Sequence, residues 1–337
     1  MAKQRVSGAC GGEAERTRMG GAGELALGTA QLGLLGGDAP AFALLDAFVE
    51  RGGTRVDTAR VYSDRIPGER GRSERIIGDW MHRRGNRDRI SIATKGAHPP
   101  LGRMGHARMS PREIRSDLEA SLRALRTDRV DVYYVHRDDP ARPAGEIVET
   151  LEGFAREGLV RSYGCSNWTA ARIREAAAHA RDHGCRGFAA SQVLWNIGSR
   201  AMKPPGDPTM KVMDDELLEL HRTTGLAAVA YSSQAGGFFS KVDAAGGRLR
   251  LTLRASPYAT PANLRLAAVL SQVARELGVP VSHLVLAWLL SRDIPVLPIV
   301  GCRTPEQLED SIAAARLRLE PEPAARLDAA VYDRRTP

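Results

Sequence analysis

Short runs of apolar residues alternate with longer amphipathic stretches along the chain from Glu24 onward. This alternation is typical of βα units, in which each buried strand is followed by a helix that covers the sheet. Runs bounded by Gly, Pro, Asp or Ser predict eight strands. These are residues 26–29, 54–57, 90–95, 130–136, 160–166, 188–195, 226–231 and 295–300.

Helix start and stop signals fall between these runs. The apolar stretch 41–51 ends at a pair of glycines, which is a common helix stop. Ser110 precedes Pro111, and Glu113 follows in the first turn, so we expect a capped helix to begin there. The segment Thr304-Pro305-Glu306 predicts a second helix start of the same kind. The first of these helices shows an apolar face at spacings of four and three, formed by Ile114, Leu118, Leu122 and Leu125.

Eight βα units over residues 24–337 predict an α/β fold with one (β/α)8 barrel. The alternative is an open doubly wound sheet, which would place a G-x-G-x-x-G fingerprint after its first strand. The segment 28–33 reads Gly-Thr-Ala-Gln-Leu-Gly and lacks that spacing. Residues 1–23 show no apolar periodicity, so we expect a flexible N-terminal leader.

Composition narrows the classes of function. The chain has 337 residues, of which 43% are hydrophobic and 5% aromatic, so its core must be mainly aliphatic. The net charge of +8 comes from arginines spread along the chain and interleaved with acids. A nucleic-acid interface would instead gather cations and aromatic residues on one element, so we expect no nucleic-acid partner.

Targeting and metal signals are also lacking in the sequence. No apolar run reaches the roughly 18 residues of a membrane span, and the N-terminus does not read as a secretory signal. The cysteines Cys10, Cys165, Cys185 and Cys302 form no CxxC pair, which predicts neither a metal site nor a disulfide framework. We therefore expect a cytoplasmic protein without a membrane partner.

Charged and polar residues end several of the predicted strands. The side chains at the C-terminal ends of parallel barrel strands meet at one mouth, where barrel enzymes place their active sites. Asp57, Lys95 and His136 end three consecutive strands. Burying an unpaired ion is costly, so we expect Asp57 and Lys95 to pair with each other.

Tyr62 follows Asp57 by five residues and is the candidate acid–base group. A free tyrosine has a pKa of about 10. A nearby ammonium group stabilises the phenolate, so we expect Lys95 to lower the pKa of Tyr62. His136 would then hold the oxygen that is being protonated. The four residues together suit the reduction of a carbonyl group, with a hydride supplied by a cofactor.

Each of these residues also has an ordinary interpretation. A lysine at a strand end is often a surface group, although Lys95 is the only lysine between Lys3 and Lys203. His136 would be a hydrogen-bonded core or rim residue, and Asp57 would be the N-cap of a helix after the second strand.

The chain resembles the aldo-keto reductase superfamily in five segments that occur in the family order. These are Gly53-Thr-Arg-Val-Asp-Thr-Ala-Arg-Val-Tyr62, Val130-Asp-Val-Tyr-Tyr-Val-His136, Gly164-Cys-Ser-Asn-Trp168, Ser191-Gln-Val-Leu-Trp-Asn196 and Ala230-Tyr-Ser232. The resemblance implies a (β/α)8 barrel that uses NADPH, with a tetrad of Asp57, Tyr62, Lys95 and His136.

The resemblance also implies the cofactor contacts. Ser166, Asn167 and Gln192 match the positions that hydrogen-bond the nicotinamide carboxamide, and Tyr231 matches the position that stacks on its ring. The phosphates of the cofactor are expected to lie against the glycine-containing segment after Tyr231 and the helix start at Thr304. The residues expected to contact NADP(H) are Gly28, Thr29, Ala30, Asp57, Ser166, Asn167, Gln192, Tyr231, Ser232, Gln234, Gly236, Cys302, Arg303, Gln307, Asp310 and Ser311.

Two features bear on specificity. The family usually ends its last cofactor segment in Glu-Asn, where this chain has Asp310-Ser311. We expect both residues still to reach the adenosine, and the preference for NADP over NAD is left open. The segments 96–110, 198–211 and 236–260 are expected to be loops that shape the substrate pocket, with Trp168 and Trp195 either as its walls or as core residues.

The predicted activity is an NADPH-dependent reduction of an aldehyde or ketone, with Tyr62 as general acid and a small molecule as substrate. Two alternatives remain: a cofactor-binding regulatory subunit with negligible turnover, and an isomerase or epimerase that holds NADP tightly. Assembly into a homo-oligomer is also left open.

Overall fold

A computed structural model describes residues 22–332 of the chain. Eight parallel strands pair in chain order and close into a barrel, in which β1 pairs with both β2 and β8. The predicted (β/α)8 barrel is therefore confirmed. The strands are β1 (Ala26–Gly28), β2 (Arg55–Asp57), β3 (Ser91–Gly96), β4 (Val130–Val135), β5 (Val160–Ser166), β6 (Ala190–Leu194), β7 (Ala227–Tyr231) and β8 (Val296–Val300).

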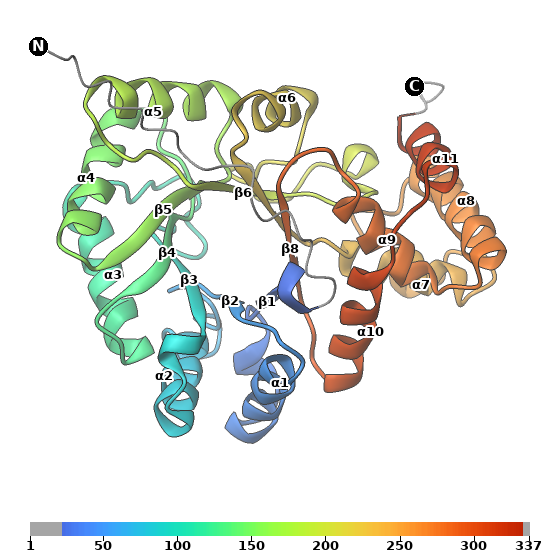
Figure 1. Cartoon of the computed structure of the whole chain (residues 1–337), viewed down its shortest axis with the longest axis horizontal. Helices are drawn as coiled ribbons and strands as arrows, with labels where there is room; N and C mark the ends of the chain where they lie inside the picture. The colour runs from blue at the N-terminus through green and yellow to red at the C-terminus, as the bar shows by residue number, and fades with distance from the viewer. Residues whose placement is uncertain (1–21, 333–337) are drawn as a thin grey trace, which may run out of the picture.

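Helices surround the strands on the outside of the barrel (Figure 1). They are α1 (Asp38–Glu50), α2 (Arg72–Arg84), α3 (Pro111–Leu125), α4 (Ala144–Arg156), α5 (Ala170–Asp182), α6 (Asp215–Thr224), α7 (Phe238–Asp243), α8 (Pro261–Leu277), α9 (Val281–Leu290), α10 (Pro305–Arg316) and α11 (Pro321–Val331). The leader predicted over 1–23 lies outside the described residues, except that Ala22 and Gly23 begin a short 3-10 helix, Ala22–Glu24.

Side-chain capping explains why α3 and α10 begin where the sequence predicts. The Ser110 hydroxyl accepts a hydrogen bond from the Glu113 amide, and the Glu113 carboxylate accepts one from the Ser110 amide. This reciprocal capping box satisfies two amides that the first turn leaves unpaired. At the start of α10, the Thr304 hydroxyl accepts from the Gln307 amide.

The hydrophobic core has two parts. The larger part lies between the strands and the helices, and a small cluster fills the barrel interior with residues such as Tyr134, Val229 and Ile299. Trp168 and Trp195 are almost completely buried in the larger part, where Trp195 packs edge-on against Trp288. The two tryptophans are therefore core residues and do not line the cavity at the barrel mouth.

The segment 236–260 differs from the prediction of a loop. It contains the short helix α7, because Phe238, Phe239 and Val242 bury their side chains against the barrel. Helix α7 packs with α8 and α9, and α8 also contacts α11, so these helices form one group at the side of the barrel (Figure 1).

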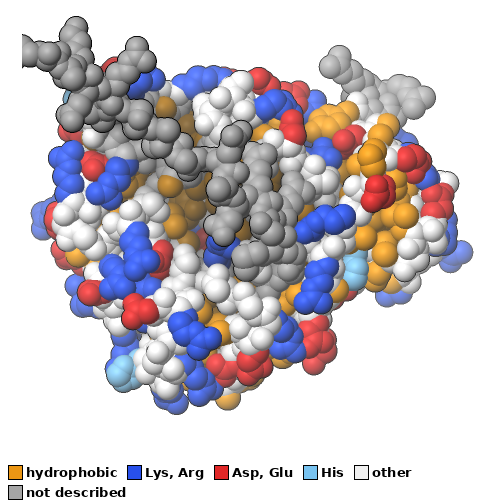
Figure 2. All heavy atoms as spheres, in the orientation of Figure 1, with side chains coloured by type: hydrophobic (Ala, Val, Ile, Leu, Met, Phe, Trp, Pro, Cys, Tyr) orange, Lys and Arg blue, Asp and Glu red, His pale blue; other side chains and the backbone are white. Residues whose placement is uncertain are grey.

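No single helix within residues 22–332 is long and apolar enough to cross a membrane. Helices α8 and α9 reach the required length and hydropathy only as a pair, which is bent by 99°. On the face drawn in Figure 2, basic and acidic side chains are interleaved, as the sequence pattern indicates.

Candidate active site

Asp57 and Lys95 form an ion pair at the C-terminal mouth of the barrel. Asp57 ends β2 and Lys95 lies one residue before the end of β3, and both side chains are almost completely buried. Lys95 Nζ lies 2.6 Å from Asp57 Oδ1 and donates a second hydrogen bond of 2.6 Å to the Thr58 carbonyl. Lys95 is therefore a fully enclosed cation, which rules out the interpretation of a surface lysine.

The backbone after β2 carries Tyr62 back toward this ion pair. The Thr58 amide donates to the Ala93 carbonyl and the Arg60 amide to the Lys95 carbonyl, so the chain stays bonded to β3 beyond the end of the strand. Lys95 Nζ consequently lies 3.3 Å from the Tyr62 hydroxyl and 4.9 Å from the centre of the Tyr62 ring. The structure thus brings the predicted acid within hydrogen-bond distance of the predicted ammonium.

The predicted lowering of the Tyr62 pKa is not found in this structure. Burial disfavours the phenolate and raises the pKa of Tyr62 above 10.0, although the charge of Lys95 acts in the opposite direction. Burial also acts to lower the pKa of Lys95, but the charges of Asp57 and Tyr62 outweigh it and raise that pKa. At neutral pH the site therefore holds a protonated phenol beside a protonated amine.

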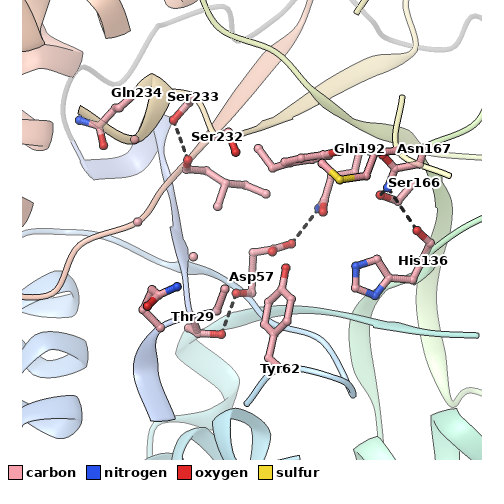
Figure 3. A pocket seen from close by; sticks show the side chains of 18 of the residues that line it. Thr29, Asp57, Tyr62, His136, Ser166, Asn167, Gln192, Ser232, Ser233 and Gln234 are labelled. Atoms are coloured by element: carbon pink, nitrogen blue, oxygen red, sulfur yellow. Dashed lines mark hydrogen bonds between the residues drawn. The ribbon is translucent and has the colours of Figure 1, made fainter. Parts of the chain in front are cut away.

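His136 follows β4 and faces the same space as Tyr62 (Figure 3). The two rings have centroids 6.0 Å apart at an interplanar angle of 75°. Burial lowers the pKa of His136 well below 6.5, with the charge of Arg137 acting in the same direction, so its imidazole is neutral at neutral pH. His136 Nδ1 is buried without a hydrogen-bond partner among residues 22–332. The residue itself lines the cavity at the barrel mouth, where its ring is close to a bound ligand.

Asn167 connects three segments around the mouth. Its Nδ2 donates to Ser166 Oγ and to the His136 carbonyl, while its Oδ1 accepts from the Tyr231 hydroxyl and from the Lys211 amide. Asn167 has a φ of 63°, in the left-handed region that non-glycine residues adopt rarely and that asparagine tolerates best. The side-chain bonds hold this conformation and fix the backbone of His136.

Gln192 contacts the ion pair from the opposite side of the barrel. Its Nε2 donates a 2.8 Å hydrogen bond to Asp57 Oδ2 (Figure 3). Asp57 is therefore held by Lys95 and Gln192 and does not cap a helix, since the first α-helix after β2 begins only at Arg72. This contact was not predicted, because Gln192 and Asp57 lie on strands β6 and β2, which are not neighbours in the sheet.

The predicted cofactor residues lie along two connected cavities. The first has a volume of about 400 Å³ at the barrel mouth, and the second has about 650 Å³ beside α10. Both are lined by Gln31, Gln234, Gly236, Gly237 and Gly301. The predicted residues on the first cavity are Gly28, Thr29, Ala30, Asp57, Ser166, Asn167, Gln192, Tyr231, Ser232, Gln234 and Gly236. Those on the second are Gln234, Gly236, Cys302, Arg303, Gln307, Asp310 and Ser311.

The groove formed by the two cavities suits an extended dinucleotide. Gly236 and Gly237 have φ values of 60° and 74°, and a Cβ on Gly236 would enter open space with no atom within 4 Å. The backbone is thus open to a ligand at the junction of the two cavities. Buried Ser166, Asn167 and Gln192 supply polar groups at one end, and Lys241 and Arg303 supply cations at the other. These residues fit a nicotinamide dinucleotide cofactor.

The start of α10 offers fewer free amides than the sequence suggests. The Arg303 amide donates to Gln307 Oε1 and the Gln307 amide to the Thr304 hydroxyl. Arg303 Nη2 lies 3.4 Å from Gln31 Oε1. The exposed guanidinium of Arg303 is therefore the more accessible group for a phosphate at this end of the groove.

Asp310 and Ser311 already have protein partners. His283 Nε2 lies 3.0 Å from Asp310 Oδ1. Ser311 Oγ accepts from Gln234 Nε2 and donates to the Gln307 carbonyl. The Ser311 hydroxyl, which we expected to reach the adenosine, instead joins α10 to the segment after β7.

Other residues of the site were not found by sequence reasoning. Arg137 lines the first cavity although it is almost completely buried, and it donates hydrogen bonds to the His136 carbonyl, Thr209 and Asp207. His98 packs edge-on against His136, with ring centroids 4.7 Å apart. The position of Arg137 directly after His136 was the one available signal for its place at the mouth.

Comparison with known proteins agrees with this geometry. The aldo/keto reductase family model matches residues 24–331. Norsolorinic acid reductase stcV of Emericella nidulans is 31% identical over 297 residues, covering 84% of this chain and 69% of that protein. The uncharacterized oxidoreductase YrpG of Bacillus subtilis is 30% identical over 303 residues, covering 88% and 89%. The putative aryl-alcohol dehydrogenase AAD14 of Saccharomyces cerevisiae is 29% identical over 327 residues, covering 92% and 82%.

The barrel, the groove at its mouth and the match over residues 24–331 lead to one conclusion. The chain belongs to the aldo/keto reductase family and is an NAD(P)H-dependent oxidoreductase.

Proposed function

We propose that this protein is an NADPH-dependent carbonyl reductase in which Tyr62 donates a proton to the carbonyl oxygen of an aldehyde or ketone. The observation that carries the proposal is the position of the Tyr62 hydroxyl, 3.3 Å from the buried Lys95 ammonium, at the edge of the first cavity. A phenol becomes negatively charged when it gives up its proton. The adjacent ammonium stabilises that charge, so proton donation becomes easier at the point where it is needed.

The residues around Tyr62 have separate tasks in this proposal. Asp57 keeps the Lys95 ammonium in place, because the salt bridge favours the charged amine in a buried site. His136 is neutral, so it orients the carbonyl oxygen by hydrogen bonding and leaves the proton transfer to Tyr62. NADPH supplies the hydride when it is bound.

We propose NADPH rather than NADH as the cofactor because positively charged side chains line the second cavity. Lys241 and Arg303 both line it, and both side chains are exposed. An arginine guanidinium offers paired donors to a phosphate, which suits the 2′-phosphate that distinguishes NADPH from NADH. The acids Glu306 and Asp310 line the same cavity, and Asp310 is held by His283.

The relatives suggest which substrates to test. Several carry names that refer to aryl alcohols or to norsolorinic acid. A small carbonyl compound with an aromatic ring is therefore the substrate class with which we would begin. The aldehyde panel would include benzaldehydes with ring substituents, together with aliphatic and sugar aldehydes as comparisons.

The direct test is the oxidation of NADPH, followed by its absorbance, with the full chain and the aldehyde panel. We expect saturable turnover with at least one aromatic aldehyde and the formation of one alcohol per NADPH consumed. Tight NADPH binding without turnover on any compound would contradict the proposal and favour a regulatory subunit. Conversion of substrate without net consumption of cofactor would favour an isomerase or epimerase.

A further inference from the structure

A cluster of metal-binding side chains lies on the outside of the barrel, far from the mouth. It consists of Glu149 on α4, His179 in the last turn of α5 and His183 directly after α5. One ligand atom from each residue lies within 4.8 Å of the other two. Helices α4 and α5 are neighbours on the barrel exterior (Figure 1).

The helix geometry explains why these side chains meet. His179 and His183 are four residues apart, so their side chains project from the same face of α5. Their rings are stacked, with centroids 3.9 Å apart and an interplanar angle of 13°. His179 Nε2 lies 2.8 Å from Glu149 Oε1 across the two helices. A Cβ on Gly145 would lie 2.3 Å from His179 Nδ1, so only a glycine in α4 leaves room for this ring.

One hydrogen bond of His183 determines which of its ring nitrogens can bind a metal ion. Its Nδ1 lies 3.0 Å from the His179 carbonyl, and a carbonyl oxygen can only accept, so Nδ1 carries the hydrogen. The lone pair of His183 is therefore on Nε2. Metal-binding histidines usually have their second ring nitrogen bonded to a carbonyl or carboxylate in this way.

We propose that Glu149, His179 and His183 form a site for a divalent transition-metal ion, with Zn²⁺ as its preferred occupant. Two imidazoles and one carboxylate are ligands that suit Zn²⁺, and a water molecule completes the tetrahedron. Tetrahedral donors at Zn–N distances of about 2.0 to 2.1 Å are about 3.3 Å apart. To bind one ion, the stacked rings of His179 and His183 turn apart, and the ion takes the place of the hydrogen between His179 Nε2 and Glu149. Glu149 and His183 are exposed, which leaves room for this movement.

The position of the cluster indicates a structural role. Helix α5 runs back from the mouth after β5, so His179 and His183, in and just after its last turn, lie toward the opposite end of the barrel. A metal held there would join α4 to α5 and stabilise the folded chain without touching the Tyr62 site. This inference departs from the expectation of no metal site, which rested on the cysteines alone.

The test is calorimetric titration of the untagged, chelator-treated full chain with ZnCl₂. We expect one equivalent to bind with a Kd in the micromolar range. The exposed His183 is the residue to change first, since His183→Ala leaves the contact between His179 and Glu149 of α4 intact. This variant should weaken Zn²⁺ binding at least tenfold, and His179→Ala combined with His183→Ala should abolish it. His82→Ala, which changes an exposed histidine on α2, is the matched control and should bind like the wild type.

A second measurement separates a structural site from chance binding to surface histidines. Zn²⁺ at a hundredfold excess over Kd should raise the Tm of the wild type by about 4 °C. It should not raise the Tm of the double variant. NADPH oxidation should be unchanged in His183→Ala, so the metal site and the proposed reductase activity are judged independently. Equal binding by the wild type and the double variant, or no saturable binding, would overturn the inference.

Discussion

Gln192 Nε2 donates a hydrogen bond of 2.8 Å to Asp57 Oδ2, across the mouth of the barrel. The other Asp57 oxygen binds Lys95, which in turn lies beside the Tyr62 hydroxyl. A residue expected to contact the nicotinamide is thus directly bonded to the carboxylate that holds the ammonium. In the proposed mechanism, cofactor binding and proton transfer would therefore share one hydrogen-bond chain.

Replacing Gln192 should therefore weaken both NADPH binding and proton transfer. Gln192→Leu keeps a side chain of similar size but leaves Asp57 Oδ2 buried without its donor. A hydrogen bond to a charged group contributes about 1.5–3 kcal/mol. We expect the Kd for NADPH to rise and kcat to fall, each by about tenfold or more, in fluorescence titration and steady-state assays. Gln272→Leu, at an exposed position on α8, is the control. A change in kcat alone, with normal NADPH affinity, would show that the two are not linked.

The pKa directions of the site predict opposite pH profiles for the two reaction directions. Burial raises the pKa of Tyr62 above 10.0, so the phenol keeps its proton at neutral pH. The kcat/KM for reduction should stay level from about pH 6 to about pH 9 and fall only above about pH 10. Alcohol oxidation needs the Tyr62 phenolate as its base. The kcat/KM for oxidation should therefore rise by up to about tenfold per pH unit between about pH 6 and about pH 9.

His136 should leave no mark on these profiles near neutral pH, because its pKa lies well below 6.5. The measurement is kcat/KM against pH in both directions on one substrate pair. A reduction rate that already declines between about pH 6 and about pH 8 would contradict the assignment of Tyr62 as a protonated acid.

Arg303 should set the preference for NADPH. Arg303→Ala removes the exposed guanidinium beside the second cavity. Loss of a charge-assisted contact to the 2′-phosphate should raise the Kd for NADPH about tenfold to a hundredfold and leave the Kd for NADH almost unchanged. Arg316→Ala, at the exposed C-terminal end of α10, should change neither value. Equal weakening of both cofactors would assign Arg303 to a part of the dinucleotide that they share.

A buried glutamate next to the tetrad makes stability depend on pH. Glu74 of α2 is completely buried and accepts a 2.6 Å hydrogen bond from Thr94, the neighbour of Lys95 on β3. Its Oε2 has no hydrogen-bond partner among residues 22–332. Burial raises the pKa of Glu74 from 4.5 to about 7. Between these two pH values the folded chain binds a proton that the unfolded chain has released, so the free energy of unfolding falls as the pH rises.

Glu74→Gln should remove this pH dependence, because the amide oxygen still accepts from Thr94 and does not ionise. Relative to Glu74→Gln, the wild type should lose about 3 kcal/mol of stability between about pH 4.5 and about pH 7, with little further change above that. Urea unfolding of both proteins at several pH values measures the difference. Parallel stability curves would mean that Glu74 does not keep its proton in the folded state.

Much of the fold was predictable because it depends on local patterns. Strands such as β7 and β8 are short apolar runs, and the capping residues Ser110 and Thr304 mark helix starts through contacts within one turn. Parallel strands in chain order also bring Asp57 and Lys95 together, since β2 and β3 pair directly. The helix α7 was missed because its formation depends on burying Phe238 and Phe239 against distant parts of the barrel.

The features that were not predicted depend on contacts between distant residues. The Gln192–Asp57 hydrogen bond crosses the barrel, and the proposed metal site combines Glu149 with two histidines from a different part of the chain. The Tyr62 pKa was predicted in the wrong direction because the sequence shows a nearby lysine but not the extent of burial, which is the larger effect.

The central claim is that Tyr62 is the proton donor. Tyr62→Phe removes only the hydroxyl oxygen that lies 3.3 Å from Lys95 Nζ. With the best aldehyde substrate, kcat for NADPH oxidation by this variant should fall by about 10²- to 10⁴-fold, while the Kd for NADPH stays within about twofold of the wild type. Wild-type turnover by Tyr62→Phe with intact NADPH binding would contradict the account.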